Sequence, residues 1–179
     1  MPIFLEDRNY DYFINRYLKF VSPFVETFAF CLLKNHFHLL IRVKDEFEID
    51  KAIKKIKRKD HFWHVSNGFS SFIQSYAQTI NKEYGRTGSL FESPFKRILV
   101  SSEEYFTTLV AYIHRNPQQH GLVKDFSNYP HSSYQMHLKN TKTWLKSKEI
   151  LNWFGSKAEY ERFHARYLWH ADLQKLLVE

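Results

Sequence analysis

The sequence predicts a protein of the α+β class, and three patterns support this prediction. Residues 10–20 place apolar side chains at helical spacing, residues 24–43 have the composition and alternation of two strands, and further helical patterns follow. At 179 residues the chain is long enough for one domain with a sizeable core. We therefore expect a helix, a hairpin, and then mostly helices.

The first helix and the hairpin have clear local signals. Asp7 or Asn9 can cap the helix over 10–20, and Ser22-Pro23 follows its end. Residues 24–33 are rich in β-branched and aromatic side chains, which is typical of a buried strand. Lys34-Asn35 is a candidate two-residue turn, although it lacks the preferred glycine. Residues 24–43 are therefore predicted to form an antiparallel hairpin.

The middle of the chain predicts two helices separated by a connector. Residues 45–58 begin acidic and end basic, which indicates a solvated helix whose basic end could touch phosphates. Residues 61–68 have the composition of a connector. The periodic apolar side chains of residues 69–84 predict an amphipathic helix, ended by Gly85 and Gly88.

The second half of the chain predicts one more strand and several helices. Residues 91–100 have a strand pattern, with Pro94 at an edge or bulge position. Ser101 and Glu104 form a capping box that opens a helix, and Pro117 is expected to end it at Asn116. Two aromatic-rich helices are expected near residues 147–154 and 157–170.

Composition narrows the class of partner and the compartment. The net charge is +7, from 26 basic and 19 acidic residues, so a polyanion is favoured over an acidic protein surface. The single cysteine, Cys31, excludes an internal disulfide and a multi-cysteine zinc site. No apolar run is long enough to cross a membrane, and the N-terminus lacks a signal-peptide pattern. A cytoplasmic protein without a membrane partner is expected.

The most informative stretch is residues 36–43. On a strand, His36 and His38 share one face with Leu40, and the other face carries an apolar row expected to pack on the core. Neutral imidazole is a common metal ligand, and rings two residues apart can converge on one ion. The alternative is a half-buried strand with two surface histidines.

A second chemical signal lies in the helix before Pro117. Tyr112 and Asn116 are one turn apart on the same face. A phenol near a metal ion could attack a phosphodiester, and the Asn116 amide oxygen could be a third ligand beside the two histidines. Taken singly, Tyr112 could equally be a core aromatic and Asn116 an ordinary helix-end residue.

Four motifs in one order resemble the single-tyrosine HUH transposases, specifically the REP-associated tyrosine transposases of the small insertion-sequence family. The resemblance spans roughly residues 3–170. Its motifs are His36-Phe37-His38, the run Tyr84-Gly85-Arg86-Thr87-Gly88-Ser89-Leu90-Phe91, the segment from Tyr112 through Asn116-Pro117 to Gly121, and Tyr129-Pro130 followed by Ser132-Ser133-Tyr134.

The resemblance implies a fold, a reaction and a set of residues. The family fold is a ferredoxin-like antiparallel sheet with helices on one face, here over residues 1–125, with a C-terminal helical extension over 126–179. Tyr112 becomes the nucleophile, and His36, His38 and Asn116 become the ligands of Mg²⁺ or Mn²⁺. The basic residues expected to contact DNA are Arg42, Arg86, Lys96, Arg97 and Arg115.

The implied activity is cleavage and rejoining of single-stranded, hairpin-bearing DNA through a 5′-phosphotyrosine intermediate. A covalent intermediate conserves the energy of the broken bond, so no nucleotide cofactor is expected. The protein is expected to act as a monomer or homodimer. Family members begin with a β-strand before the position of Ile3-Phe4, whereas the printed sequence begins at Met1, so that strand is expected to be absent here.

Two competing hypotheses remain open. One is a nucleic-acid-binding relative that keeps the scaffold but has little or no cleavage activity. The other is a metallohydrolase in which His114 or His120 joins His36 and His38 around Zn²⁺. Hydrolysis would leave no covalent protein–DNA adduct, which separates this hypothesis from the transposase reaction.

Overall fold

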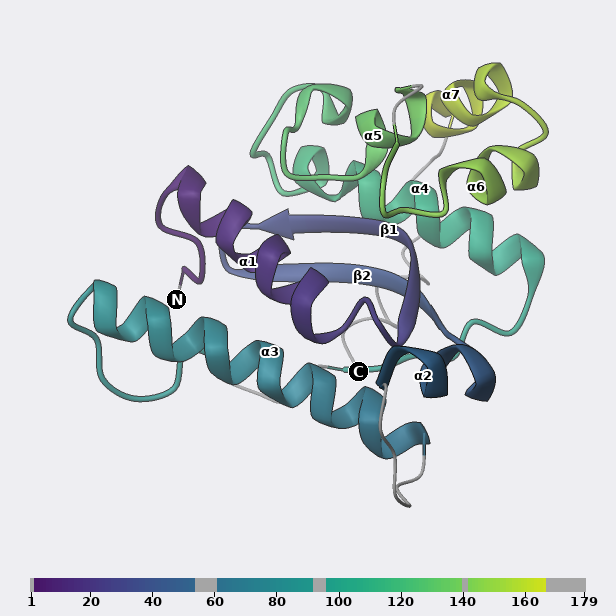
Figure 1. Ribbon diagram of the computed structural model, residues 1–179. Coiled ribbons are helices and arrows are strands. Elements are labelled where there is room, and N and C mark those ends of the chain that lie inside the picture. The colour runs from purple at the N-terminus through teal and green to yellow at the C-terminus, as the bar shows by residue number, and fades with distance from the viewer. Residues whose placement is uncertain (1, 54–60, 92–95, 140–141, 167–179) are drawn as a thin grey trace. The chain divides into compact units, whose positions relative to one another are not determined.

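The structure is a computed structural model that describes residues 2–53, 61–91, 96–139 and 142–166 (Figure 1). In chain order the elements are α1 (Asp7–Phe20), β1 (Val25–Leu33), β2 (His36–Val43), α2 (Glu46–Ile53), α3 (His61–Glu83), α4 (Glu103–Gln119), the 3₁₀ turn η1 (Phe126–Asn128), α5 (Tyr134–Leu138), α6 (Ser147–Trp153) and α7 (Lys157–Arg166). The α+β class is therefore confirmed.

The contacts divide the chain into two compact units. The first contains residues up to 27, 33–36 and 41–92, and the second contains 28–32, 37–40 and the chain from 93 onward. The middle of the β1–β2 hairpin thus belongs to the second unit, and its ends belong to the first. The predicted division into 1–125 and 126–179 stays a prediction.

The predicted hairpin is present, with the turn at Lys34-Asn35. β1 and β2 form a two-stranded antiparallel sheet, and eight of the nine β1 residues are buried. Within the described part of the chain the sheet has these two strands, so the full ferredoxin-like sheet implied by the resemblance is not seen. Of the strand expected over 91–100, residues 92–95 lie outside the described residues. Residues 96–100 have no regular structure, so the prediction is wrong for this portion. A strand needs a pairing partner, and a local pattern cannot supply one.

The expectation for the two faces of β2 also needs correction. Leu40, on the histidine face, is 6% exposed, whereas Val43 of the opposite apolar row is 41% exposed. Phe37, Leu39 and Ile41 are only half-buried. Because His36 and His38 are half-buried as well, both faces of β2 are partly covered by the protein, and neither face is buried along its whole length.

In the first unit, α1 lies against α3 (Figure 1). The two helices pack through aromatic side chains. Phe13 meets Phe72 and Tyr76 in edge-on geometry, with ring centroids 4.6 and 5.0 Å apart. All three side chains are fully buried. Edge-to-face pairs of this kind add to the stabilisation from burial alone. The Tyr76 hydroxyl also donates a 2.7 Å hydrogen bond to the Ile3 carbonyl, which holds the N-terminal segment against α3.

Helix α3 begins earlier than the sequence predicts, because residues 61–68 are helical and not a connector. Gly68 explains the error. A Cβ at this position would lie 2.5 Å from the Phe20 carbonyl oxygen, so the glycine permits close packing of two backbones. The predicted end is correct, since the helix ends at Glu83 and Gly85, two residues later, has a φ of +59°. The helix predicted over 45–58 is present as α2, and residues 54–58 lie outside the described residues.

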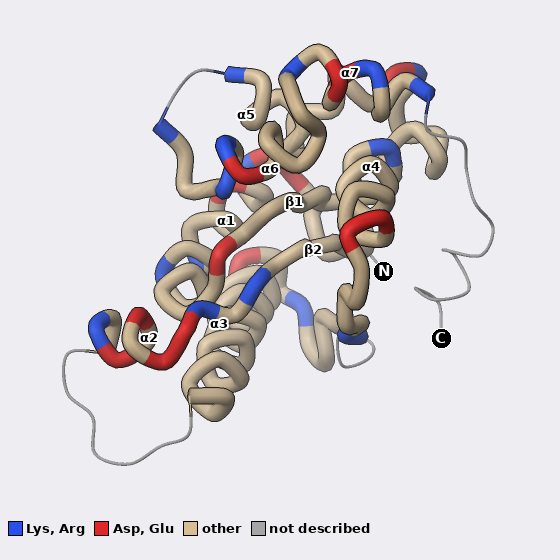
Figure 2. The backbone as a smooth tube through the Cα atoms, turned by 90° about the vertical axis from the view of Figure 1, so that its right-hand side faces the viewer, with Lys and Arg blue, Asp and Glu red and all other residues tan. Residues whose placement is uncertain are grey.

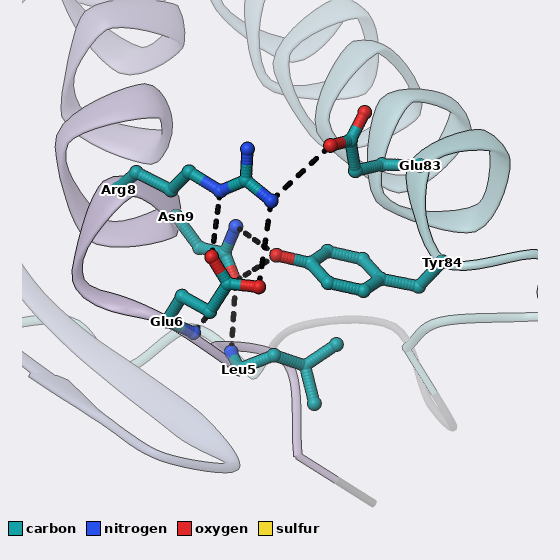
Figure 3. Close-up of polar contacts among 6 residues, drawn as sticks. All are labelled: Leu5, Glu6, Arg8, Asn9, Glu83 and Tyr84. Atoms are coloured by element: carbon teal, nitrogen blue, oxygen red, sulfur yellow. Dashed lines mark hydrogen bonds and ion pairs between the residues drawn. The ribbon is translucent and has the colours of Figure 1, made fainter.

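A polar cluster joins the start of α1 to the end of α3 (Figure 3). The Asn9 Oδ1 atom accepts hydrogen bonds from the backbone N–H groups of Leu5 and Glu6, at 2.9 and 3.0 Å. Its Nδ2 atom donates to the Tyr84 hydroxyl at 3.1 Å. Arg8 adds an ion pair to Glu83 at 3.2 Å. Asn9 therefore caps α1 from within its first turn, and Glu6 is the N-cap residue.

The second unit is built around α4, which contacts η1 and α7. The N-cap is Ser102, whose Oγ accepts from the Tyr105 N–H at 3.2 Å, so the capping box expected from Ser101 and Glu104 is wrong and the helix is capped one residue later. Pro117 does not end the helix, which continues to Gln119 before Gly121 with a φ of +68°. A proline near the helix end removes one backbone hydrogen bond, and the last turn tolerates this loss. Both predicted C-terminal helices are present, as α6 and α7, and residues 167–170 of the second prediction lie outside the described residues.

The Tyr129–Tyr134 segment lies along β1. An isolated antiparallel bridge joins Ser132 to Cys31, and the Leu32 N–H donates to the His131 carbonyl at 2.9 Å. The Tyr129 hydroxyl donates to the Leu32 carbonyl at 2.7 Å. These bonds pair the outer edge of β1. Among the described helices, none is long and apolar enough to span a membrane.

Candidate active site

Helix α4 presents the proposed nucleophile and one proposed ligand from its buried stripe. Tyr112 is 5% exposed, and Asn116, one turn later, is fully buried. Leu109 and Ile113 flank them on the same buried side. The i, i+4 spacing inferred from the sequence therefore places the phenol and the amide side by side, within the core of the second unit.

His38 of β2 lies against Tyr112. Their ring centroids are 5.6 Å apart, and the planes meet at 74°, an edge-on contact. The His38 Nε2 atom is itself buried. The tertiary structure thus brings His38 of β2 to Tyr112 and Asn116 of α4, although His38 and Tyr112 are more than seventy residues apart in the chain.

The environment of Tyr112 opposes ionisation of its hydroxyl. Burial raises the pKa of the phenol above its ordinary value of 10.0, and a contact with the Asn116 side chain lowers it in part. Buried Cys31 nearby adds a smaller upward effect on this pKa. At neutral pH the phenol is therefore protonated, and its reaction as a nucleophile requires loss of the proton and stabilisation of the developing charge.

Asn116 has the most unusual polar environment of the candidate residues. Both its Oδ1 and its Nδ2 are buried, and neither has a partner of good hydrogen-bond distance and angle among the described residues. An unsatisfied buried amide costs about 1–3 kcal/mol, and such groups call for a specific explanation. An amide oxygen is a normal ligand for a hard cation. The Asn116 side chain therefore fits a site that holds a divalent cation or an ordered water.

The case for a metal site among these residues depends on the Asn116 amide. No group of three or more His, Cys, Asp or Glu side chains that could hold a metal ion occurs in the part of the chain that the structure describes. His36 is half-buried, and its Nδ1 lies 2.9 Å from the Asn35 Oδ1. By strand alternation it shares a face of β2 with His38. The ligand set His36, His38 and Asn116 stays a prediction.

The basic residues expected near DNA differ in their surroundings. Lys96 and Arg97 are exposed on the segment before α4. Arg42 is exposed but pairs with Glu26, with nitrogen–oxygen distances of 2.7 and 2.5 Å. Their contact with DNA stays a prediction.

Two other predicted DNA contacts have intramolecular partners. Arg86 donates to the Pro2 carbonyl at 3.3 Å. The guanidinium of Arg115 lies 4.8 Å from the centre of the Phe126 ring and donates to the His164 carbonyl at 2.7 Å. Arg115 therefore links α4 to α7, a role that its sequence position did not indicate.

A buried histidine cluster was missed by the sequence analysis. The His114 Nδ1 lies 2.9 Å from the His164 Nε2, and its Nε2 lies 2.6 Å from the Ser133 Oγ. The Tyr160 hydroxyl also approaches the His114 Nδ1, at 3.2 Å. Both His114 nitrogens are thus engaged within the second unit, which argues against His114 as a zinc ligand beside His38. The i, i+4 spacing of Tyr160 and His164 was the available signal.

Comparison with known proteins supports the same family that the sequence motifs resemble. The chain is similar to a protein of Haemophilus influenzae (strain Rd) that is named "Putative REP-associated tyrosine transposase". The two are 25% identical over 148 residues, which cover 76% of this chain and 79% of that protein. No family model matches the chain. No solved structure matches it either.

Proposed function

We propose that this protein processes DNA as a transposase-type enzyme, cleaving and rejoining single-stranded, hairpin-bearing DNA through Tyr112. The observation that carries the proposal is the position of Tyr112, in contact with His38 and one turn before the fully buried Asn116. The likeness to a protein named as a tyrosine transposase supports the class of reaction.

In the proposed reaction the Tyr112 oxygen attacks a backbone phosphorus. A bond forms between that oxygen and phosphorus, and the bond from phosphorus to the 3′ oxygen breaks. The phenol proton is lost, and the departing 3′ oxygen takes up a proton to become a free hydroxyl. The product is a 5′-phosphotyrosine, and a 3′-hydroxyl can reverse the step on the same or another strand. No oxidant or nucleotide cofactor is needed.

The surrounding side chains have distinct tasks in this proposal. Asn116, one turn from Tyr112, would stabilise the ionising phenol, and its downward effect on the Tyr112 pKa supports this role although the two groups form no hydrogen bond of good geometry. His36, His38 and Asn116 would hold Mg²⁺ or Mn²⁺, which supplies Lewis-acid stabilisation of charge at the scissile phosphate when bound. The exposed Lys96 and Arg97 would contact the DNA backbone.

The test is formation of a covalent adduct that survives denaturation. Wild-type protein, incubated with Mn²⁺ and a single-stranded hairpin oligonucleotide, should give a slower-migrating band on a denaturing gel. Tyr112→Phe should abolish the band while leaving oligonucleotide binding within about twofold, because only the hydroxyl is removed. Tyr105→Phe is the matched control on the same helix and should retain the adduct. An adduct with Tyr112→Phe would assign the nucleophile elsewhere.

One observation favours a second candidate function, a DNA-binding protein that does not cleave. Tyr112 is 5% exposed and its pKa is raised by burial, both of which hinder attack on a phosphodiester. The same experiment separates the two functions. Binding of the oligonucleotide without any adduct, in Mg²⁺ and in Mn²⁺, would favour the binding protein.

A further inference from the structure

An open depression lies in the second unit between the end of α5 and the start of α6. Its volume is about 510 Å³, and it is lined by Met136, Lys139, Lys142, Thr143 and Trp144. Small-molecule sites in proteins commonly occupy about 300–1,000 Å³, so the depression is large enough for one nucleotide. None of the candidate active-site residues lines it.

The indole of Trp144 is held in a defined orientation. It stacks on Phe30 of β1, with centroids 5.5 Å apart and planes within 17° of parallel. Phe30 is 5% exposed, and its backbone N–H donates to the Ser133 Oγ at 2.9 Å. Thr143 accepts a hydrogen bond from the Leu145 N–H at 3.2 Å, which fixes the backbone around the tryptophan. Trp144 therefore projects from a rigid support.

The charge around the depression is mainly positive. Lys139 and Lys142 are exposed at its rim, and basic positions follow α5 and precede α6 (Figure 2). Lys146 and Lys148 lie further along, whereas Glu149 is the one acidic residue in the sequence between 134 and 157. Such a surface attracts anions. Aromatic and thioether groups beside two ammonium groups match a ligand that has both a flat ring and a phosphate.

We propose that this depression binds one nucleotide of single-stranded DNA, with the base against Trp144 and Met136 and the phosphate at Lys139 and Lys142. An acidic peptide would use the lysines but would leave the indole without a counterpart. The inference rests on the proposed function in naming a DNA strand as the polymer. It adds a DNA contact in the C-terminal extension, separate from Tyr112.

The experiment measures equilibrium binding in the Tyr112→Phe protein, so that cleavage plays no part. The probe is a fluorescein-labelled oligodeoxythymidylate, followed by anisotropy at several salt concentrations. Trp144→Ala should raise Kd by about five- to a hundredfold, the usual effect of losing one base–aromatic stack. Trp144→Phe preserves a ring against Phe30 and should raise Kd by less than about threefold.

The role of Lys139 and Lys142 is tested with two double variants that each remove two positive charges. Lys139→Ala with Lys142→Ala should weaken binding and reduce the slope of log K against log salt by about 0.7, the contribution of the one phosphate that both lysines contact. Lys146→Ala with Lys148→Ala removes the same charge outside the depression and should change that slope by less than half as much. Equal effects of the two pairs, or wild-type affinity in Trp144→Ala, would overturn the proposal.

Failure of this site and failure of the proposed function give different results. If the wild-type protein forms no adduct but Trp144→Ala still weakens binding, the nucleotide site stands and the Tyr112 chemistry falls. If the adduct forms through Tyr112 while every lining variant binds as wild type does, the nucleotide site falls and the nuclease function stands.

Discussion

At the scale of single residues, Asn116 combines a cost to stability with a role in the proposed site. Its side chain is fully buried, and neither polar atom has a well-formed hydrogen bond among the described residues. Residues that reduce stability without a structural benefit are commonly found where function requires them. The nearby Tyr112, whose raised pKa also reflects burial, belongs to the same small region of α4.

Asn116→Leu should separate stability from function. Leucine has a similar shape and no polar atoms, so the free energy of unfolding in EDTA should rise by about 1 kcal/mol, as buried unsatisfied groups are removed. Urea titration followed by circular dichroism measures this change. Adduct formation should be lost at the same time. Asn152→Leu, on the exposed side of α6, is the control and should change stability by less than about 0.5 kcal/mol. Destabilisation by Asn116→Leu would show that the amide is satisfied in the folded protein.

At the scale of elements, the junction of α1 and α3 depends on close backbone packing. Gly68 allows the first turns of α3 to approach the Phe20 carbonyl and the Phe24 ring. At the other end of α3, Asn9 and Tyr84 hold the start of α1. The two helices are thus attached at both ends, and the aromatic contacts of Phe13 with Phe72 and Tyr76 fill the space between.

Gly68→Ala should reverse the usual effect of a glycine replacement in a helix. Alanine normally stabilises a helix interior by about 1 kcal/mol. Here its Cβ would meet the Phe20 carbonyl oxygen at 2.5 Å, so one of the backbones must shift. We expect a net destabilisation of about 1–3 kcal/mol, measured by thermal or urea unfolding. Ser70→Ala, at an exposed position two residues later, should leave stability within about 0.5 kcal/mol. A stabilised Gly68→Ala protein would contradict the close contact.

At the scale of the whole molecule, the second unit has a polar centre that is neutral in the folded state. His114, His137 and His164 are all buried, at 0–2% exposure. Burial lowers the pKa of His137 to about 4 and that of His164 to about 3, and it holds the pKa of His114 well below its ordinary 6.5. Neighbouring histidines add smaller downward effects on the pKa values of His114 and His164. These three histidines are therefore uncharged in the folded protein.

This arrangement predicts a marked loss of stability in mild acid. Below pH 6.5 the unfolded chain binds protons that the folded histidines exclude, so stability falls as the pH drops toward 4. Each histidine contributes about 1.4 kcal/mol per pH unit within its window, or about 2 kcal/mol between pH 6.5 and 5. Urea unfolding at pH 7.5, 6 and 5 measures the slope. His137→Gln should reduce it, whereas His120→Gln, at an exposed position, should leave it unchanged. A stability independent of pH over this range would contradict the neutral cluster.

Local pattern in the sequence was enough to predict the class of the fold and the neighbouring positions of two candidate site residues, Tyr112 and Asn116. Helical periodicity located α1 and most of α3, β-branched and aromatic composition located the hairpin, and both signals act over a few residues. The i, i+4 relation of Tyr112 and Asn116 is likewise a property of one helix. Such features follow from the chain's own geometry, which is why residue spacing determines them.

Only the tertiary structure determined the features that depend on contacts between residues distant in sequence. Residues 61–68 have the composition of a connector, yet they form the first part of α3. Gly68 lies where the backbone of Phe20 leaves no room for a Cβ atom, and this packing is not visible in the local sequence. Residues 96–100 have a strand pattern, yet they form no strand because pairing needs a second edge. His38 meets Tyr112, and His114 meets His164, only after the chain folds. Contacts of this kind arise from packing between elements, and no local spacing in the sequence encodes them.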